Sequence, residues 1–287
     1  MQKDKYFDNN DVLHSYDIDI ETSPCTNSYN YTSLDEINKI IESIDDIEKL
    51  IKVIAEFRAL KGYDFFYRGL PNNNYKLLPS IVWNNVKDYS QEKIILEKAK
   101  LICKKYGCDE YKLPIFNENL FYMGICRHLG LYSKLMDWTT DIWCALSFLN
   151  IGDEEKDGVL WVLATSRKDI QPEEIDPFVD DNKIHILKEN YYLPYESNDI
   201  TDQPLGIFRR YRQHGYFTIH PKYSVDIPLN EITLPKGMEL IKISIPSKVK
   251  KELSNCDKII KKEKLLIDKD DPIIKEIEFL NQQYVKR

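Results

Sequence analysis

Residues 65–70 form the first of three short clusters whose residue types could do chemistry. A run of aromatic side chains leads to Arg68, and Gly69 follows it. A guanidinium at this place can hold an anion through two N–H donors, and a glycine beside it lets the backbone approach the ligand closely. The structural alternative is that Arg68 pairs with a carboxylate at the edge of the core, which a single Arg-Gly pair taken alone favours.

The second cluster, residues 127–140, holds hydroxyl groups, a carboxylate, a histidine and a lysine between two apolar helical segments. Polar groups held between buried elements need partners, so this cluster is either a satisfied structural network or a site. Asp137 and Thr139 are its candidate site residues. In the structural alternative, Asp137 bonds backbone amides in a turn, and Thr140 with Asp141 caps the helix that follows.

The third cluster, residues 209–217, places Arg209, Arg210 and Arg212 just before a segment that begins at Gly215 and has the pattern of a strand. Such a concentration of positive charge can bind the phosphate of a nucleotide or of a nucleic acid. The alternative is a solvated basic turn on an acidic protein.

Several common kinds of active site are disfavoured by missing motifs. The chain has no P-loop, no GxGxxG after a strand and no GxSxG. Neither His128 nor His214 belongs to a metal-spaced or Ser-His-Asp pattern, and the 6 cysteines form no CxxC pair. We therefore expect no metal site, and we interpret the cysteines as reduced cytosolic thiols.

The composition is that of a soluble globular chain, with 43% hydrophobic and 30% charged side chains in 287 residues. The formal net charge of -7 and the pI near 5.4 argue against a surface built to coat a phosphate backbone. The longest apolar run, around residues 142–149, is too short to span a bilayer, and the N-terminus has no apolar signal core. The expected location is the cytoplasm, without membrane contact.

The elements that must position these clusters can be predicted from hydrophobic periodicity. Apolar residues at helical spacing over 34–57 predict an amphipathic helix, and a second cap signature at Ser43 and Asp46 would divide it into two helices in series. An aromatic strand over 63–67 should bring Arg68 to an edge of the sheet. Further helices are predicted over residues 91–106, 117–129 and 141–149.

The second half of the chain alternates less regularly. A continuous apolar run over 159–164 predicts a strand at the centre of the sheet, and residues 167–206 have the composition of a surface excursion. Strands over 215–220 and 239–246 and helices over 247–254 and 272–285 complete the pattern. We predict an α+β fold with a mixed central sheet flanked by helices. A helical N-terminal part, residues 1–60, would pack on a domain formed by residues 61–287.

Several blocks follow one another along the chain: Tyr67-Arg68-Gly69, Leu78–Ile81, His128–Leu131 with Leu135–Thr139, Ala145–Phe148, Gly158–Val162, and Arg210 with Gln213–Ile219. In this order they resemble the FRG domain family, over roughly residues 60–270. Arg127 stands where family members usually have glutamine, and Lys134 stands where they usually have arginine and lacks the guanidinium fork. Tyr132, Ser133 and Met136 also depart from the family pattern, in place of proline, threonine and leucine.

The order of these blocks also resembles that of the arginine-type ADP-ribosyltransferases, which implies an ADP-ribosyltransferase-like fold and NAD as substrate. In that resemblance Arg68 clamps a phosphate or ribose of NAD, Thr139 orders the nicotinamide ribose pocket, and Tyr67 or Trp138 supplies a stacking face. Gln213 stands where the transferases normally have glutamate. The implied catalytic residues are Arg68, Asp137, Thr139 and Gln213, and the implied NAD-binding residues are Tyr67, Arg68, Gly69, His128, Trp138 and Arg210.

Two functions follow as hypotheses. The first is an ADP-ribosyltransferase-like or NAD-hydrolysing intracellular effector, such as a bacterial toxin or an anti-phage defence protein, with a protein or nucleic-acid acceptor. The second is a non-catalytic module in which Arg68, Asp137 and Arg210 bind a nucleotide or a nucleic acid. We expect Arg68, Asp137 and Gln213 to converge on one pocket. The sequence predicts neither an oligomeric state nor a biological partner.

Overall fold

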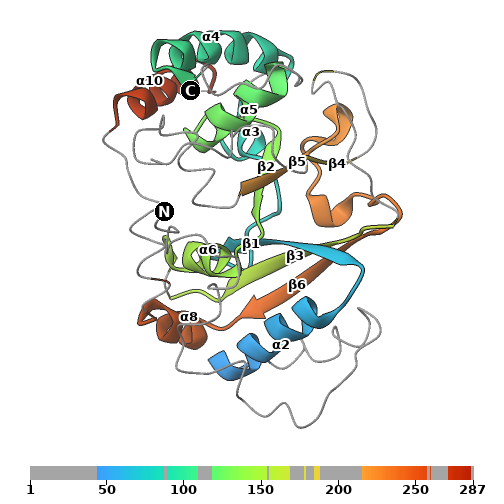
Figure 1. Ribbon diagram of the computed structural model, residues 1–287. Helices are drawn as coiled ribbons and strands as arrows, with labels where there is room; N and C mark the ends of the chain where they lie inside the picture. The colour runs from blue at the N-terminus through green and yellow to red at the C-terminus, as the bar shows by residue number, and fades with distance from the viewer. Residues whose placement is uncertain are drawn as a thin grey trace, which may run out of the picture.

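The computed structural model describes residues 44–86, 89–108, 118–153, 155–168, 178, 184–187, 215–256, 259 and 271–285. One sheet separates two groups of helices (Figure 1). The helices are α2 (Ile47–Ala59), α3 (Ser80–Trp83), α4 (Glu92–Lys105), α5 (Glu118–His128), α6 (Ile142–Ser147), α8 (Ser247–Ser254) and α10 (Pro272–Gln282). The strands are β1 (Tyr63–Leu70), β2 (Leu135–Thr139), β3 (Gly158–Ser166), β4 (His185–Leu187), β5 (Gly215–Ile219) and β6 (Met238–Ile245).

The strands lie in the order β4-β5-β2-β1-β3-β6, and every described pair is antiparallel. The α+β class is therefore confirmed, whereas the expected mixed sheet was wrong. Antiparallel pairs accept both short and long connections, so a mixture of helices and strands along the sequence does not predict strand direction. The centre was also misplaced, because β2 and β1 occupy it and β3 lies one strand from the edge.

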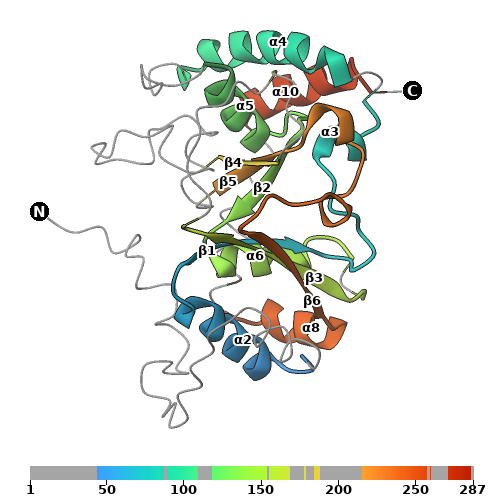
Figure 2. The same cartoon turned by 90° about the vertical axis from the view of Figure 1, so that its right-hand side faces the viewer.

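The sheet divides between β1 and β2. β1 pairs with β3 over its whole length, from Tyr63 to Leu70, and β2 pairs with β5 over Leu135–Thr139. The described pairing between β1 and β2 is Tyr67 opposite Thr139. The subsheets β1-β3-β6 and β2-β5-β4 therefore diverge from one point (Figure 2), and side chains from both meet there.

Helix α2 covers the β1-β3-β6 subsheet together with α6 and α8. Its apolar face, including Leu50 and Phe57, is buried in the same core cluster as residues of β3 and β6. The helix begins at Ile47, and its N-cap is Asp46, whose carboxylate accepts a hydrogen bond of 2.8 Å from the Lys49 N–H. The expected signature placed the cap at Ser43, which lies outside the described residues. Residues 1–43 lie outside the described residues, and the rest of the expected N-terminal part stays a prediction.

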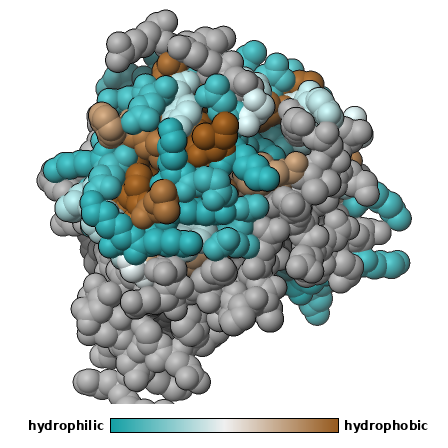
Figure 3. All heavy atoms as spheres, turned by 90° about the horizontal axis from the view of Figure 1, so that it is seen from above, coloured by the Kyte–Doolittle hydropathy of each residue, from teal (hydrophilic) through white to brown (hydrophobic). Residues whose placement is uncertain are grey.

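Helices α4, α5 and α10 pack on the β2-β5-β4 subsheet, with Leu96, Ile125, Phe217 and Ile277 in a shared core cluster. This confirms the helices expected over residues 91–106, 117–129 and 272–285. Seen from above, this side of the molecule is largely hydrophilic, with separate hydrophobic spots (Figure 3). Apolar side chains scattered singly in this way need no functional explanation.

Helix α6 crosses β1 at Gly69. A Cβ atom on Gly69 would lie 1.9 Å from the backbone oxygen of Ala145, so the position requires glycine for close helix–strand packing. Gly69 therefore does not end the strand, which continues to Leu70. The expectation that Arg68 lies at a sheet edge was wrong, because β1 has neighbours on both sides.

Two strands lie in segments that were not predicted as strands. β2 lies within residues 131–140, and β4 lies within the expected surface excursion over 167–206. Both are short, and the polar residues in these segments obscure any period-two alternation. Among the described residues, no helix is long and apolar enough to cross a membrane.

Candidate functional site

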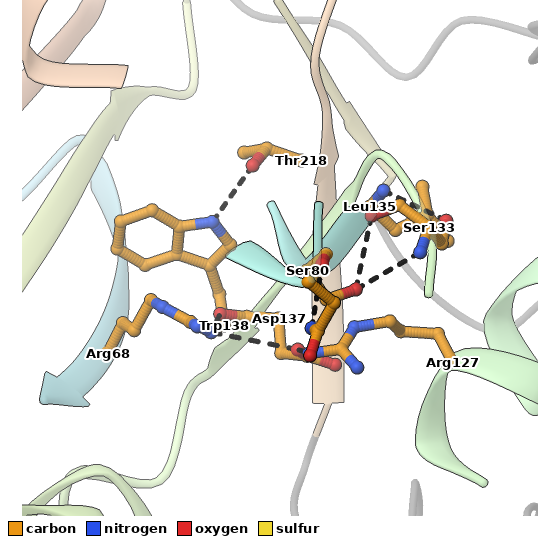
Figure 4. Close-up of polar contacts among 9 residues, drawn as sticks. Arg68, Ser80, Arg127, Ser133, Leu135, Asp137, Trp138 and Thr218 are labelled. Atoms are coloured by element: carbon orange, nitrogen blue, oxygen red, sulfur yellow. Dashed lines mark hydrogen bonds and ion pairs between the residues drawn. The ribbon is translucent and has the colours of Figure 1, made fainter. Parts of the chain in front are cut away.

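Asp137 lies between two arginines that come from different elements (Figure 4). Nη2 of Arg127, in the last turn of α5, lies 2.5 Å from Oδ2 of Asp137 on β2. Nη1 of Arg68 on β1 lies 3.7 Å from the same carboxylate oxygen and donates a 2.7 Å hydrogen bond to the backbone oxygen of Asp137. These three residues, called here the Arg68–Asp137–Arg127 cluster, span the point where the two subsheets diverge.

The Asp137 carboxylate is held ionised by its neighbours. Burial raises the pKa of Asp137, but the charges of Arg127, Arg68 and His128 and the hydrogen bond from Arg127 lower it by more. The pKa therefore lies below its ordinary value. Burial lowers the pKa of the Arg68 guanidinium, as does the charge of Arg127, while Asp137 raises it. Arginine nevertheless stays protonated in proteins. Two guanidiniums and one carboxylate leave the cluster with a surplus positive charge.

The cluster is open to solvent in part. The exposed fractions of the side chains are 19% for Arg68, 18% for Arg127 and 27% for Asp137. Arg68 contacts Asp137 through Nη1 and Arg127 contacts it through Nη2. Within the described part of the chain, the other Nη atom of each guanidinium has no protein partner. Each arginine therefore keeps donors for a ligand.

His220 lies next to Arg68 and was missed by the sequence analysis. It follows β5, is 1% exposed, and neither ring nitrogen has a hydrogen-bond partner among the described residues. Burial and then the charge of Arg68 lower its pKa to about 4. His220 is therefore a neutral imidazole at neutral pH. The signal that could have found it is the alternation in β5, which places residue 220 on the same face as Tyr216 and Thr218.

The first part of the second cluster is a structural network instead. The carboxylate of Glu92 accepts hydrogen bonds from the backbone N–H of Lys134, at 2.7 Å, and from the hydroxyl of Ser133, at 3.1 Å. The Ser80 hydroxyl in turn donates to the backbone oxygen of Ser133 (Figure 4). Burial raises the pKa of Glu92, against the opposing effects of Lys134 and Ser133. Lys134 therefore serves Glu92 rather than Asp137.

Thr139 and Trp138 are also held by structural contacts. The Thr139 hydroxyl accepts a 2.9 Å hydrogen bond from the Asp141 N–H, and the Asp141 carboxylate caps α6 by accepting from the Trp143 N–H. Trp138 is 3% exposed, and its Nε1 donates to the Thr218 hydroxyl at 3.0 Å (Figure 4). The ring of Trp138 is thus packed in the core and offers no open stacking face.

The remaining predicted residues divide between core and undescribed positions. Tyr67 is 4% exposed in the core on the α6 side of β1, and the ring of His128 packs 5.0 Å from that of Phe217. Gln213 and Arg210 lie outside the described residues. Arg68 and Asp137 contact each other, whereas their place in one pocket and the convergence of Gln213 with them stay predictions.

A cavity of about 590 Å³ opens where β1 and β2 diverge. Its lining includes the aromatic residues Tyr63, Phe65, Phe66, Tyr67 and Tyr216, and also Thr140. Its volume is within the range of small-molecule sites, which is about 300–1,000 Å³. Phe66, which lines the cavity, and Arg68 lie two residues apart on the same face of β1, but the lining includes neither Arg68 nor Asp137 nor Arg127. Within the described residues, no group of histidine, cysteine, aspartate and glutamate could hold a metal ion.

Residues 63–158 match the model of the FRG domain. The match begins at β1, ends at the first residue of β3, and contains Arg68, Arg127 and Asp137. Neither a curated protein nor a solved structure matches the chain.

Proposed function

Because the chain is an FRG domain protein with this cluster inside the matched residues, we propose that it binds a nucleotide and holds a phosphate group between Arg68 and Arg127. The observation that carries the proposal is the pair of guanidiniums, one from β1 and one from α5, oriented by a single carboxylate. Planar guanidiniums match phosphate oxygens in charge and geometry. Their fixed positions reduce the entropy lost on binding.

The cluster is better suited to recognition than to acid–base catalysis. A general acid or base must gain or lose a proton near the working pH, and the lowered pKa keeps Asp137 ionised well below neutrality. His220 is buried and neutral, with a pKa of about 4, and it is also unsuited to that task at pH 7. Binding is therefore the function that these residues support directly.

The second candidate function is NAD chemistry on an ADP-ribosyltransferase-like fold. It is favoured by the cavity of about 590 Å³ beside Phe66, whose aromatic lining suits a nicotinamide or adenine ring while Arg68 holds the phosphates. Such chemistry develops positive charge on the ribose and needs a carboxylate to stabilise it. Asp137 is already paired with two arginines, and Gln213 carries no charge. An active enzyme would act as an intracellular effector, such as a bacterial toxin or an anti-phage defence protein.

The experiment is titration calorimetry of the full chain with NAD, together with measurement of nicotinamide release with and without protein or nucleic-acid acceptors. Binding without nicotinamide release supports the module, and release supports the enzyme. A matched control is Lys251→Met on α8, which removes a positive charge from a side chain that is 57% exposed and pairs with Glu155. If NAD does not bind, or if the control weakens binding as much as Arg68→Lys does, the cluster is not the site.

A further inference from the structure

The Arg68–Asp137–Arg127 cluster presents a smaller net positive charge to a ligand than two arginines alone would. Asp137 contacts both guanidiniums through its carboxylate, so one of the two positive charges is already balanced inside the site. His220 adds no charge at neutral pH, because burial and Arg68 hold its pKa at about 4. Counted over the two guanidiniums and the carboxylate, the surplus that faces a ligand is one positive charge. At pH 8 a histidine with the ordinary pKa of about 6.5 adds no further charge.

A ligand that contacts both arginines must also lie near the carboxylate. Nη1 of Arg68 lies 3.7 Å from Oδ2 of Asp137, and Nη2 of Arg127 lies 2.5 Å from the same oxygen. The donors left over belong to the same two guanidiniums. A phosphate held by them therefore lies within a few ångströms of Asp137, where like charges repel strongly because the site is partly buried.

Phosphate groups differ in the charge that they bring to such a site. A phosphate inside a pyrophosphate bridge carries one negative charge, whereas a phosphate monoester carries nearly two above its second pKa of about 6. The first charge matches the surplus of the cluster. The second meets the Asp137 carboxylate without a balancing cation.

We propose that Asp137 makes this site selective for the singly charged, bridged phosphates of a dinucleotide such as NAD, and against terminal phosphate monoesters. This inference rests on the proposed nucleotide binding. It assigns Asp137 to specificity, through both the orientation of the arginines and the repulsion of a second negative charge.

The test compares ADP-ribose with ADP, which share the adenosine and the pyrophosphate but differ in whether the terminal phosphate is capped. The calorimetry is done at pH 8, because histidine side chains with the ordinary pKa of about 6.5 are neutral there and add no charge. The unaltered protein is expected to bind ADP-ribose about tenfold more tightly than ADP, as one uncompensated charge near a partly buried carboxylate predicts. Binding of ADP as tight as that of ADP-ribose would overturn the inference.

Asp137→Asn isolates the charge. The amide keeps an oxygen that can accept from Arg127, and the backbone oxygen that accepts from Arg68 is unchanged. The variant is expected to lose most of the tenfold preference, mainly because ADP binds more tightly. If both ligands bind the variant with an unchanged ratio, Asp137 does not set the selectivity, and the proposed nucleotide binding stands.

A third arm separates the dinucleotide from nucleic acid. A short single-stranded oligonucleotide with a 5′-hydroxyl end carries singly charged phosphates without a pyrophosphate. Tighter binding of this oligonucleotide than of ADP-ribose would overturn the dinucleotide assignment. If the unaltered protein binds none of these probes, both the selectivity and the proposed function fail.

Discussion

Nη2 of Arg127 on α5 lies 2.5 Å from Oδ2 of Asp137 on β2, although the two residues are separated by a change of element and by Gly130. Gly130 has a φ of 97°, in the left-handed region that favours glycine, and it ends the helix so that the chain can turn back. The pair therefore depends on the turn between α5 and β2. It also couples the helix to the divergence of the two subsheets.

Replacing Arg127 should lower both the free energy of unfolding and the affinity for the ligand. Arg127→Gln removes the shortest contact of Asp137, and a partly buried carboxylate that loses a charged partner typically costs about 1–3 kcal/mol of stability. Urea denaturation measures this loss. Ligand affinity should fall about tenfold, because one of two guanidinium forks is lost. The result that contradicts the prediction is a variant with unchanged stability and unchanged affinity.

Arg68→Lys tests the second guanidinium with its charge retained. Nη1 of Arg68 makes both contacts with Asp137, which leaves Nη2 of the planar guanidinium for a ligand. Lysine has a single nitrogen for both tasks, so calorimetry should show affinity for NAD reduced about tenfold. The circular dichroism spectrum should stay that of the parent. Equal affinity of parent and variant would show that only the charge of residue 68 matters.

Gly69→Ala should destabilise the fold strongly. The new Cβ would lie 1.9 Å from the Ala145 oxygen, so α6 must move off β1, at a cost of about 3 kcal/mol or more. Gly62→Ala is the matched control, since it has a φ of 90° but no atom within 4 Å of the added Cβ. That variant should lose about 1–2 kcal/mol from backbone strain alone. A smaller loss at residue 69 than at residue 62 in thermal or urea unfolding would refute the packing argument.

His220 predicts a specific pH dependence of stability. Its folded pKa of about 4 lies below the unfolded value of 6.5, so the unfolded chain binds a proton that the folded chain refuses, and stability falls as the pH drops from 6.5 through 4. Below pH 4 the loss from this residue approaches about 3 kcal/mol. His220→Phe removes this contribution while the carboxylates titrate as before. Urea unfolding of parent and variant between pH 7 and pH 4 should diverge by that amount, whereas parallel curves would exclude the effect.

The sequence by itself predicted those elements that local physics specifies. The helical periodicity of α4, α5 and α10 follows from neighbouring residues, and so does the strand pattern of β5 and β6. It also indicated Arg68 and Asp137 as candidate site residues, because their residue types stood out between apolar segments. The blocks that resemble the FRG domain family could also be identified from the sequence, and residues 63–158 match the model of that domain.

Only the tertiary structure decided which polar residues are partners. Lys134 and Asp137 lie three residues apart, yet one contacts Glu92 and the other contacts Arg127 and Arg68. β2 was not predicted from periodicity, and the alternation in β5 could place His220 on a face but not show that it is buried beside Arg68, because strand pairing and burial are set by residues far away in the chain. The two roles expected for Arg68 are compatible, because it pairs with the Asp137 carboxylate through Nη1 and keeps further donors for an anion. Long-range packing, not local pattern, brings β1, α5 and β2 to one point and makes the cluster.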